Sequence, residues 1–239
     1  MADLAKQSKF PRVDFKPEDF AKLIQDKGYK VTWWRGMTCP CLDQRSKQPD
    51  PACPLCDHTV GFYYYEEKTV RAVCSSLTSK DAMEYFSQHL MGSAYITFRM
   101  DEVMPGWYDK IIMNNSLALF SEQIIKKATD TTHRLYYPPA ISDESDHGML
   151  KVINKDGTEY EEGVDYKIDG NLFTWLTGTT AEKYFALLYE YHPEYIVIDL
   201  PHEIRNTYLK KKLKAEKFQK MPTQVIARKK HLLGPENSE

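Results

Sequence analysis

Four of the five cysteines lie close together in the sequence and could bind a metal ion. Cys39, Cys41, Cys53 and Cys56 form a Cys-Pro-Cys pair and a Cys-Pro-Leu-Cys pair, separated by 11 residues. Tetrahedral zinc takes four thiolate or imidazole ligands, with zinc–sulfur bonds of about 2.3 Å. The second pair fits a tight turn whose backbone amides point at the sulfurs. The pattern predicts a structural metal site for zinc, with iron as the alternative ion.

The first pair is the less usual half of this motif, because one residue separates its cysteines. An extended chain, which the prolines of the loop favour, still lets both sulfurs reach one ion. His58 is an alternative ligand, and Asp57 a more remote one. The loop has too few apolar residues to fold alone, so the ion would fold it. Four reduced cysteines without an ion are the other interpretation, and Cys74 is expected to be a buried apolar residue.

No catalytic motif accompanies the cysteines. The sequence has no Gly-rich phosphate loop, no His-Glu-x-x-His and no Gly-x-Ser-x-Gly. His192 and His202 bracket a predicted strand, but an acid–base dyad there lacks a nucleophile and an orienting partner. A redox role for Cys53 and Cys56 is disfavoured by the neighbouring pair. The sequence therefore predicts a protein that is not an enzyme.

The composition is that of a globular chain with one large or two small domains. The chain has 239 residues, of which 42% are hydrophobic and 28% charged. An aromatic share of 13% favours sheets and contact surfaces. The net charge of -2 gives no overall field that attracts nucleic acid. No apolar run approaches the roughly 18 residues of a membrane helix. Because a signal peptide is also missing, we expect synthesis in a cytoplasm and no membrane contact.

The elements that must position the cysteines are predicted from the apolar periodicity. An extended arm over 1–16 precedes a helix over 17–27, which Gly28 ends. A strand over 30–34 leads into the cysteine loop. Two strands follow the loop and are separated by a turn at Glu67-Lys68.

Strands at regular spacing then continue through the chain, which is typical of a sandwich or barrel. Besides strands over 62–66 and 69–77, they are expected over 94–99, 107–113, 124–127, 135–137, 150–154, 159–160, 166–169, 171–176, 184–192, 195–200 and 224–227. A second helix is predicted over 79–90 and a basic one over 204–220. The fold class is thus mainly β with a few helices (α+β), with a β-sandwich or barrel core and a metal-stabilised cysteine loop.

The expected organisation has four segments, and charge is divided unevenly among them. They are an arm over 1–16, a helix with the cysteine loop and a β region over 17–140, a β-hairpin region over 141–203, and a basic helix with a C-terminal arm over 204–239. Residues 143–169 are mainly acidic, whereas residues 205–230 are strongly basic with Glu216 as the single acid.

The basic segment has two interpretations. Its lysines can contact nucleic-acid phosphates, or they form a solvated helix face or one that docks onto the acidic segment of a neighbouring copy. The lysines are Lys210, Lys211, Lys212, Lys214, Lys217 and Lys220. Trp33 and Trp34 can likewise be a base-stacking platform or core and interface residues. In both cases we favour the second interpretation over contact with nucleic acid.

Three segments resemble structural proteins of tailed bacteriophages. WWRGMTCPCLDQRSKQPDPACPLCDHTVGFYYY is similar to their tryptophan-led loop, in which Cys-Pro-Cys is followed by Cys-Pro-x-Cys-x-x-x-Gly. GVDYKIDGNLFTW with YFALLYEYHPEYIVIDLPHEIR is similar to a block with Gly-x-Asp-Tyr, Trp and Tyr-x-Tyr-x-Pro-x-Tyr-x-Val. MPTQVIARKKHLL is similar to their basic C-terminal signature. Lys183 and Ala186 depart from the block, since a Gly or a small polar turn is expected there.

The resemblance implies a virion protein of the neck, an adaptor or head-completion protein that joins portal and tail. Such proteins form closed rings, so the implied partners are copies of itself, portal, tail or neck proteins, and packaged DNA. It implies the four cysteines as metal-binding or loop-stabilising residues and no catalytic residue. A baseplate or tail-tip protein and a zinc-stabilised nucleic-acid-binding module are the alternatives. The implied location is the virion, after assembly in the host cytoplasm.

Overall fold

A computed structural model of the chain describes residues 17–50, 53–56, 61–76, 92–99, 101–126, 131–140, 148–176, 184–201, 206–209 and 217–233. Within these residues the chain is mainly β, as predicted, with one α-helix. The arm predicted over 1–16, the helix predicted over 79–90 and the residues 234–239 of the C-terminal arm lie outside them. So do 51–52, 57–60 and the lysine-rich residues 210–216.

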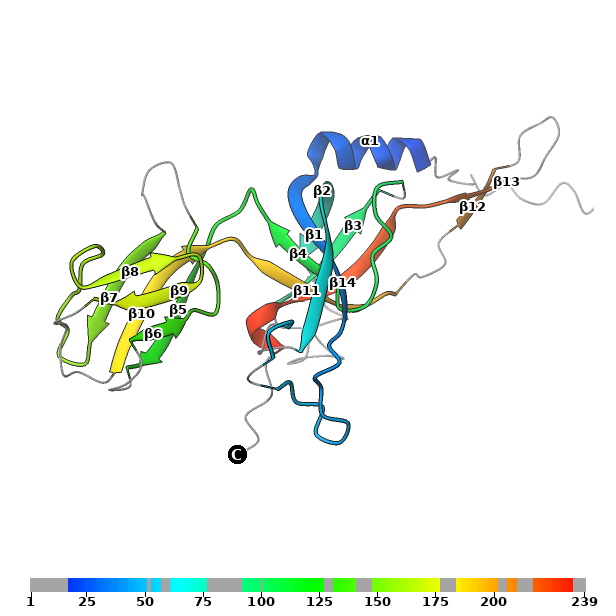
Figure 1. Cartoon of the computed structure of the whole chain (residues 1–239). Helices are drawn as coiled ribbons and strands as arrows, with labels where there is room; N and C mark the ends of the chain where they lie inside the picture. Colours follow the sequence, from blue (N-terminus) through cyan, green and yellow to red (C-terminus); the bar gives the residue numbers. More distant parts are fainter. Residues whose placement is uncertain are drawn as a thin grey trace, which may run out of the picture.

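The helix α1 (Pro17–Lys27) has the predicted bounds and lies across one end of the barrel (Figure 1). Its last turn closes where the Gly28 amide donates to the Ile24 carbonyl at 2.8 Å. A Cβ at Gly28 would lie 2.3 Å from the same oxygen, so this close approach requires glycine. Buried Ile24 anchors the helix. No helix among the described residues is long and apolar enough to cross a membrane.

Six antiparallel strands close into a barrel (Figure 1). Their order around it is β1, β2, β3, β14, β11 and β4, and β4 pairs back onto β1. The strands are β1 (Tyr29–Thr38), β2 (Phe62–Ser76), β3 (Ser93–Phe98), β4 (Lys110–Met113), β11 (Glu194–Asp199) and β14 (Thr223–Lys229). Inward-facing apolar residues such as Val31, Ile96, Ile111 and Val225 are fully buried and fill the interior. Closure gives each of these strands two neighbours, which fixes the β1–β2 hairpin on a rigid base.

Residues 118–191 form a second unit, the insertion domain, between β4 and β11. One sheet has the order β5 (Ala118–Ile125), β10 (Tyr184–Tyr191) and β7 (Met149–Asn154), and the other the order β6 (Thr132–Arg134), β9 (Leu172–Trp175) and β8 (Tyr166–Asp169). An aromatic core that includes Phe173, Trp175 and Phe185 holds them together. Figure 1 shows this domain beside the barrel. The strand pairing does not follow the expected segments 17–140 and 141–203, because β11 and β14 complete the barrel.

Three local predictions are wrong. No strand forms over 135–137, where the chain bends after the end of β6. No turn exists at Glu67-Lys68: β2 runs through it because Trp34 and Trp33 of β1 pair with these two residues. The basic helix predicted over 204–220 is contradicted by β12 (Asn206–Leu209) and β13 (Lys217–Lys220), which pair antiparallel. The register places Tyr208 opposite Phe218, so pairing between two β-forming segments replaces the weak helical pattern.

A buried carboxylate ties the β1–β2 hairpin to the start of β4. Asp109, with 0% of its surface exposed, accepts hydrogen bonds from Trp33 Nε1 (2.9 Å), Arg35 Nη1 (3.3 Å), the Gly36 amide (2.9 Å) and the Gly106 amide (2.7 Å). Burial raises the pKa of Asp109, and the two amides oppose this shift. The four donors satisfy the carboxylate, so its role is structural.

The Trp-Trp-Arg-Gly run thus acts mainly in the barrel wall. Trp33 is 1% exposed and belongs to the core, which settles the favoured interpretation for this residue. Gly36 allows β1 to pass close to the chain before Asp109, since a Cβ there would lie 2.1 Å from the Tyr108 carbonyl oxygen. Trp34 is half-buried, and the Lys110 ammonium lies over its ring, 5.4 Å from the ring centroid.

Replacing Asp109 by alanine should destabilise the protein strongly, because Trp33 Nε1 and the Gly36 and Gly106 amides lose their acceptor. We expect the free energy of unfolding to fall by about 3–5 kcal/mol in urea denaturation. Asp101→Ala is the control, since it removes the more exposed ion pair with Arg99 (2.7 Å) and should cost less than about 1 kcal/mol. Equal effects of the two substitutions would contradict the role of Asp109.

Candidate metal centre

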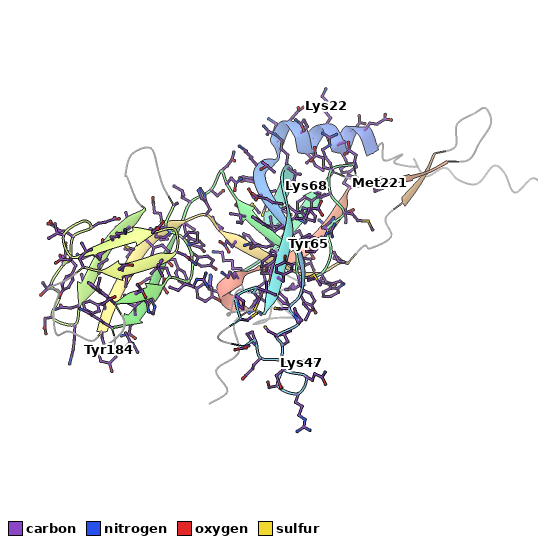
Figure 2. The ribbon with its side chains drawn as sticks, viewed as in Figure 1. Lys22, Lys47, Tyr65, Lys68, Tyr184 and Met221 are labelled. Atoms are coloured by element: carbon purple, nitrogen blue, oxygen red, sulfur yellow. The ribbon has the colours of Figure 1, made fainter. Side chains whose placement is uncertain are left out.

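The cysteine loop connects the two longest-paired strands of the barrel. β1 and β2 pair from Tyr29 opposite Ala72 to Thr38 opposite Phe62, so residues 39–61 form the end of this hairpin. In Figure 1 the loop extends below the barrel, and Figure 2 shows Lys47 pointing away at its far end. The Cys39 amide donates to the Gly61 carbonyl at 3.0 Å and continues the pairing by one step. The hairpin register therefore fixes both ends of the loop.

The four predicted ligands are brought together. Their sulfurs all lie within 4.8 Å of one another. The Cys39 and Cys53 sulfurs are 3.7 Å apart and the Cys41 and Cys56 sulfurs 3.4 Å. Sulfurs bonded to a tetrahedral ion at about 2.3 Å are separated by roughly 3.8 Å, whereas a disulfide needs about 2.05 Å. The thiols are free, and the arrangement could hold a metal ion. The single residue between Cys39 and Cys41 does not prevent convergence.

Backbone amides prepare Cys53, the first cysteine of the second pair, for the thiolate form. Hydrogen bonds from the Leu55 and Cys56 amides lower the pKa of Cys53 to about 7. This is the turn expected for the Cys-x-x-Cys spacing. Burial raises the pKa of Cys56 above its ordinary value, so in the absence of a cation this thiol stays protonated. A bound cation would reverse that balance, because it stabilises every thiolate that contacts it.

The segment between the two pairs is organised around one carboxylate. Asp43 Oδ1 accepts hydrogen bonds from the Arg45 amide (2.9 Å), the Ser46 amide (2.7 Å) and the Ser46 hydroxyl (3.0 Å). The Ser46 and Arg45 amides lower the pKa of Asp43. Lys47 adopts a φ of +58°, in the left-handed region. This compact turn leaves Arg45 and Lys47 exposed.

Sulfur atoms are the core of the loop. Cys39, Cys53 and Cys56 are buried together, and Cys41 and Tyr63 pack against them. No aliphatic side chain belongs to this cluster in the described part of the chain. The apolar area is therefore small against the entropy of ordering the loop, and metal bonds can supply the difference. The alternative ligands His58 and Asp57 lie outside the described residues.

The other candidate residues have structural surroundings. His192 Nδ1 lies 3.0 Å from the Ser116 carbonyl oxygen, and its proposed partner His202 lies outside the described residues. Cys74 is half-buried on β2 and packs against the barrel core. Burial raises the pKa of its thiol. Among the described residues, nothing pairs either side chain with a nucleophile or a general base.

Two polar clusters were missed by sequence reasoning. One is the site of Asp109, whose partner Trp33 is 76 positions away. The other joins the insertion domain to the C-terminal segment and includes Tyr137 and His231, which are 94 positions apart. In the sequence, His231 within the basic signature was the single feature that pointed to the second cluster. No sequence feature pointed to the first.

No family model matches the sequence, and no curated protein is significantly similar to it.

Replacing one ligand should abolish metal retention. We expect the wild-type protein to carry one ion per chain and Cys56→Ser to bind it more than about 100-fold more weakly. Even the loss of a residue that only hydrogen-bonds to a ligand lowers metal affinity by about 10- to 100-fold. Elemental analysis after dialysis against a graded competitor measures this. Cys74→Ser, the control outside the cluster, should retain the ion. Full retention by Cys56→Ser would refute a four-cysteine site.

Proposed function

We propose that this protein is a structural, non-enzymatic subunit of a tailed-bacteriophage virion, and that it forms a neck (head–tail connector) ring between portal and tail. Three stretches of sequence support the proposal by their resemblance to such proteins. They correspond to the β1–β2 hairpin with its cysteine loop, to β8–β11, and to β14 with the turn η2 (Lys230–Leu232). The stretches thus include barrel strands, insertion-domain strands and the loop.

The observation that carries ring formation is the position of opposite charges. Residues 148–169 of the insertion domain contain six acidic residues, namely Asp156, Glu159, Glu161, Glu162, Asp165 and Asp169, against Lys151, Lys155 and Lys167. The hairpin of β12 and β13 belongs to the basic segment and lies at the opposite end of the molecule (Figure 1). Two complementary surfaces at opposite ends favour a head-to-tail contact between copies. Repeated with a rotation, that contact closes a ring.

Zinc is the proposed ion of the cysteine cluster. Four thiolates form a closed tetrahedral set, which is typical of structural zinc and leaves no open position for a substrate. An iron atom is bound by the same ligands in other proteins, and its colour distinguishes it. In this proposal the ion holds the end of the β1–β2 hairpin in one conformation, in which it can contact a neighbouring virion protein.

Removing zinc should expose the loop to proteolysis while the barrel stays folded. Trypsin is expected to cut after Arg45 or Lys47 at least about tenfold faster in the chelated protein, because the local opening free energy falls. Mass spectrometry of the fragments measures the rates. Cleavage after Lys155, in the β7 hairpin of the insertion domain, is the internal control and should not change. Structural zinc would be refuted by equal rates of loop cleavage with and without chelator, or by a content of one iron ion per chain.

Charge reversal should disperse the rings. We expect Lys210→Glu, Lys211→Glu and Lys212→Glu together to reduce the ring fraction in sedimentation velocity by about tenfold or more, since like charges then face each other. The control carries the same charge change on α1 and β1, with Lys22, Lys27 and Lys30 replaced by glutamate. Replacing Glu159, Glu161 and Asp169 by lysine in the first variant should restore assembly.

The same variants separate the nucleic-acid alternative from the ring. A wild-type chain that stays monomeric and binds DNA with an affinity that falls steeply with salt would refute the ring and support a DNA-binding module. A ring that survives the lysine reversal would show that another surface makes the contact.

A further inference from the structure

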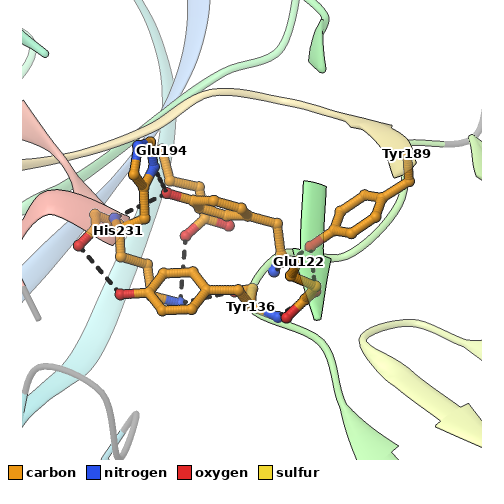
Figure 3. Close-up of polar contacts among 7 residues, drawn as sticks. Glu122, Tyr136, Tyr189, Glu194 and His231 are labelled. Atoms are coloured by element: carbon orange, nitrogen blue, oxygen red, sulfur yellow. Dashed lines mark hydrogen bonds and ion pairs between the residues drawn. The ribbon is translucent and has the colours of Figure 1, made fainter. Parts of the chain in front are cut away.

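The barrel and the insertion domain meet at a small polar cluster that neither the metal centre nor the ring contact uses (Figure 3). Residues Lys230 and His231 of η2 come from the barrel side of this contact, and Tyr136 and Tyr137 come from the insertion domain. The chain segments 114–117 and 192–193 also connect the two parts. The cluster is therefore placed where it can decide how the insertion domain is held.

Tyr136 and Tyr137 are themselves fixed within the insertion domain. Glu122 Oε1 accepts hydrogen bonds from the Tyr189 hydroxyl (2.7 Å) and the Tyr136 amide (3.1 Å). The Tyr137 amide in turn donates to the Tyr189 hydroxyl at 3.2 Å. The ring of Tyr137 stacks on that of Tyr191, with centroids 4.2 Å apart. These contacts make the two tyrosines a rigid part of the β5–β10 sheet.

Lys230 contributes a reciprocal contact across the boundary. Its ammonium donates to the Tyr136 carbonyl at 3.4 Å, while the Tyr136 hydroxyl donates to the Lys230 carbonyl at 3.3 Å. The ammonium is also 3.8 Å from Glu194 of β11, and both side chains are more than nine-tenths buried. The barrel thus supplies, in Glu194, the partner that balances the charge of Lys230.

His231 completes the contact through a hydrogen bond whose direction depends on the tautomer of its ring. The Tyr137 hydroxyl oxygen accepts from the His231 amide at 3.0 Å and lies 2.8 Å from His231 Nδ1. In the neutral tautomer with its proton on Nε2, Nδ1 is the acceptor that the Tyr137 hydroxyl hydrogen needs.

We propose that the contact of Lys230 and His231 with Tyr136 and Tyr137 is a pH-sensitive latch that holds the insertion domain against the barrel. Protonation of His231 turns Nδ1 into a donor and leaves the Tyr137 hydroxyl hydrogen without its acceptor. It also adds a positive charge beside Arg228, Lys229 and Lys230. Both effects weaken the latch, and the domain can then turn about segments 114–117 and 192–193.

The environment of His231 sets the direction of the response. Its pKa is lowered by burial and by the nearby Lys229 and Arg228. From the insertion domain it faces Tyr137, and its ring lies 5.2 Å from that of uncharged Phe120. A released histidine in water has a pKa of about 6.5. Because the latched pKa is lower, the latch has its full strength above about pH 6.5 and loses it as the pH falls, by up to about tenfold per pH unit.

The test follows the overall dimensions of the full chain by small-angle X-ray scattering between pH 8 and pH 5, with separation of assembly states on a column. Wild type should expand at a midpoint below about pH 6.5. His231→Gln, which cannot be protonated, should keep the same overall dimensions from pH 8 to pH 5. Tyr137→Phe should be expanded at every pH. His133→Gln, on β6 of the insertion domain, is the matched control and should respond like wild type.

Three outcomes would overturn the latch. One is a wild type of constant dimensions over the whole pH range. Another is an expansion that persists in His231→Gln. The last is an expansion that coincides with loss of the far-ultraviolet circular dichroism signal, since this would be unfolding. None of these outcomes depends on ring assembly, so the latch and the proposed function can fail separately.

Discussion

The pairing of β1 with β2 is the constraint on which the cysteine cluster depends. This register brings Cys39 and Gly61 to the same level at the end of the hairpin, so the loop must leave and return within a few ångströms. Asp109 holds the hairpin to the rest of the barrel by accepting from Trp33 and Gly36. A rigid base is necessary here because the loop contributes little apolar area of its own, and four sulfurs can converge only if its ends are fixed.

The molecule has two hydrophobic cores, and they are filled by different kinds of side chain. The barrel fills its interior with aliphatic residues such as Ile96 and Val225, whereas the insertion domain packs aromatic rings between two short sheets. Among the described residues, the two buried clusters share no side chain. The polar contact of Tyr137 with His231 joins the two parts, and in our proposal it stabilises their orientation.

Much of the fold and of the metal centre follows from the sequence. The spacing of Cys39, Cys41, Cys53 and Cys56 determines that four sulfurs can surround one ion, because ligation depends on residue type and a short loop. The helix over 17–27 also follows, since Pro17 and Gly28 mark its ends through local backbone chemistry. The tight turn at Cys53 is determined in the same way, by amides within three residues of the sulfur. All of these features depend on near neighbours in the chain.

Only the tertiary structure decides what distant residues do to each other. It places Asp109 under Trp33, and it sends β10 and β11 into different sheets on either side of His192 and Pro193. It also replaces the expected helix over 204–220 by paired strands, since strand pairing depends on a partner that local periodicity cannot reveal. The contact between Tyr137 and His231 has the same origin. Such pairs form when the strands on both sides of the inserted domain close the barrel, and no local pattern carries that information.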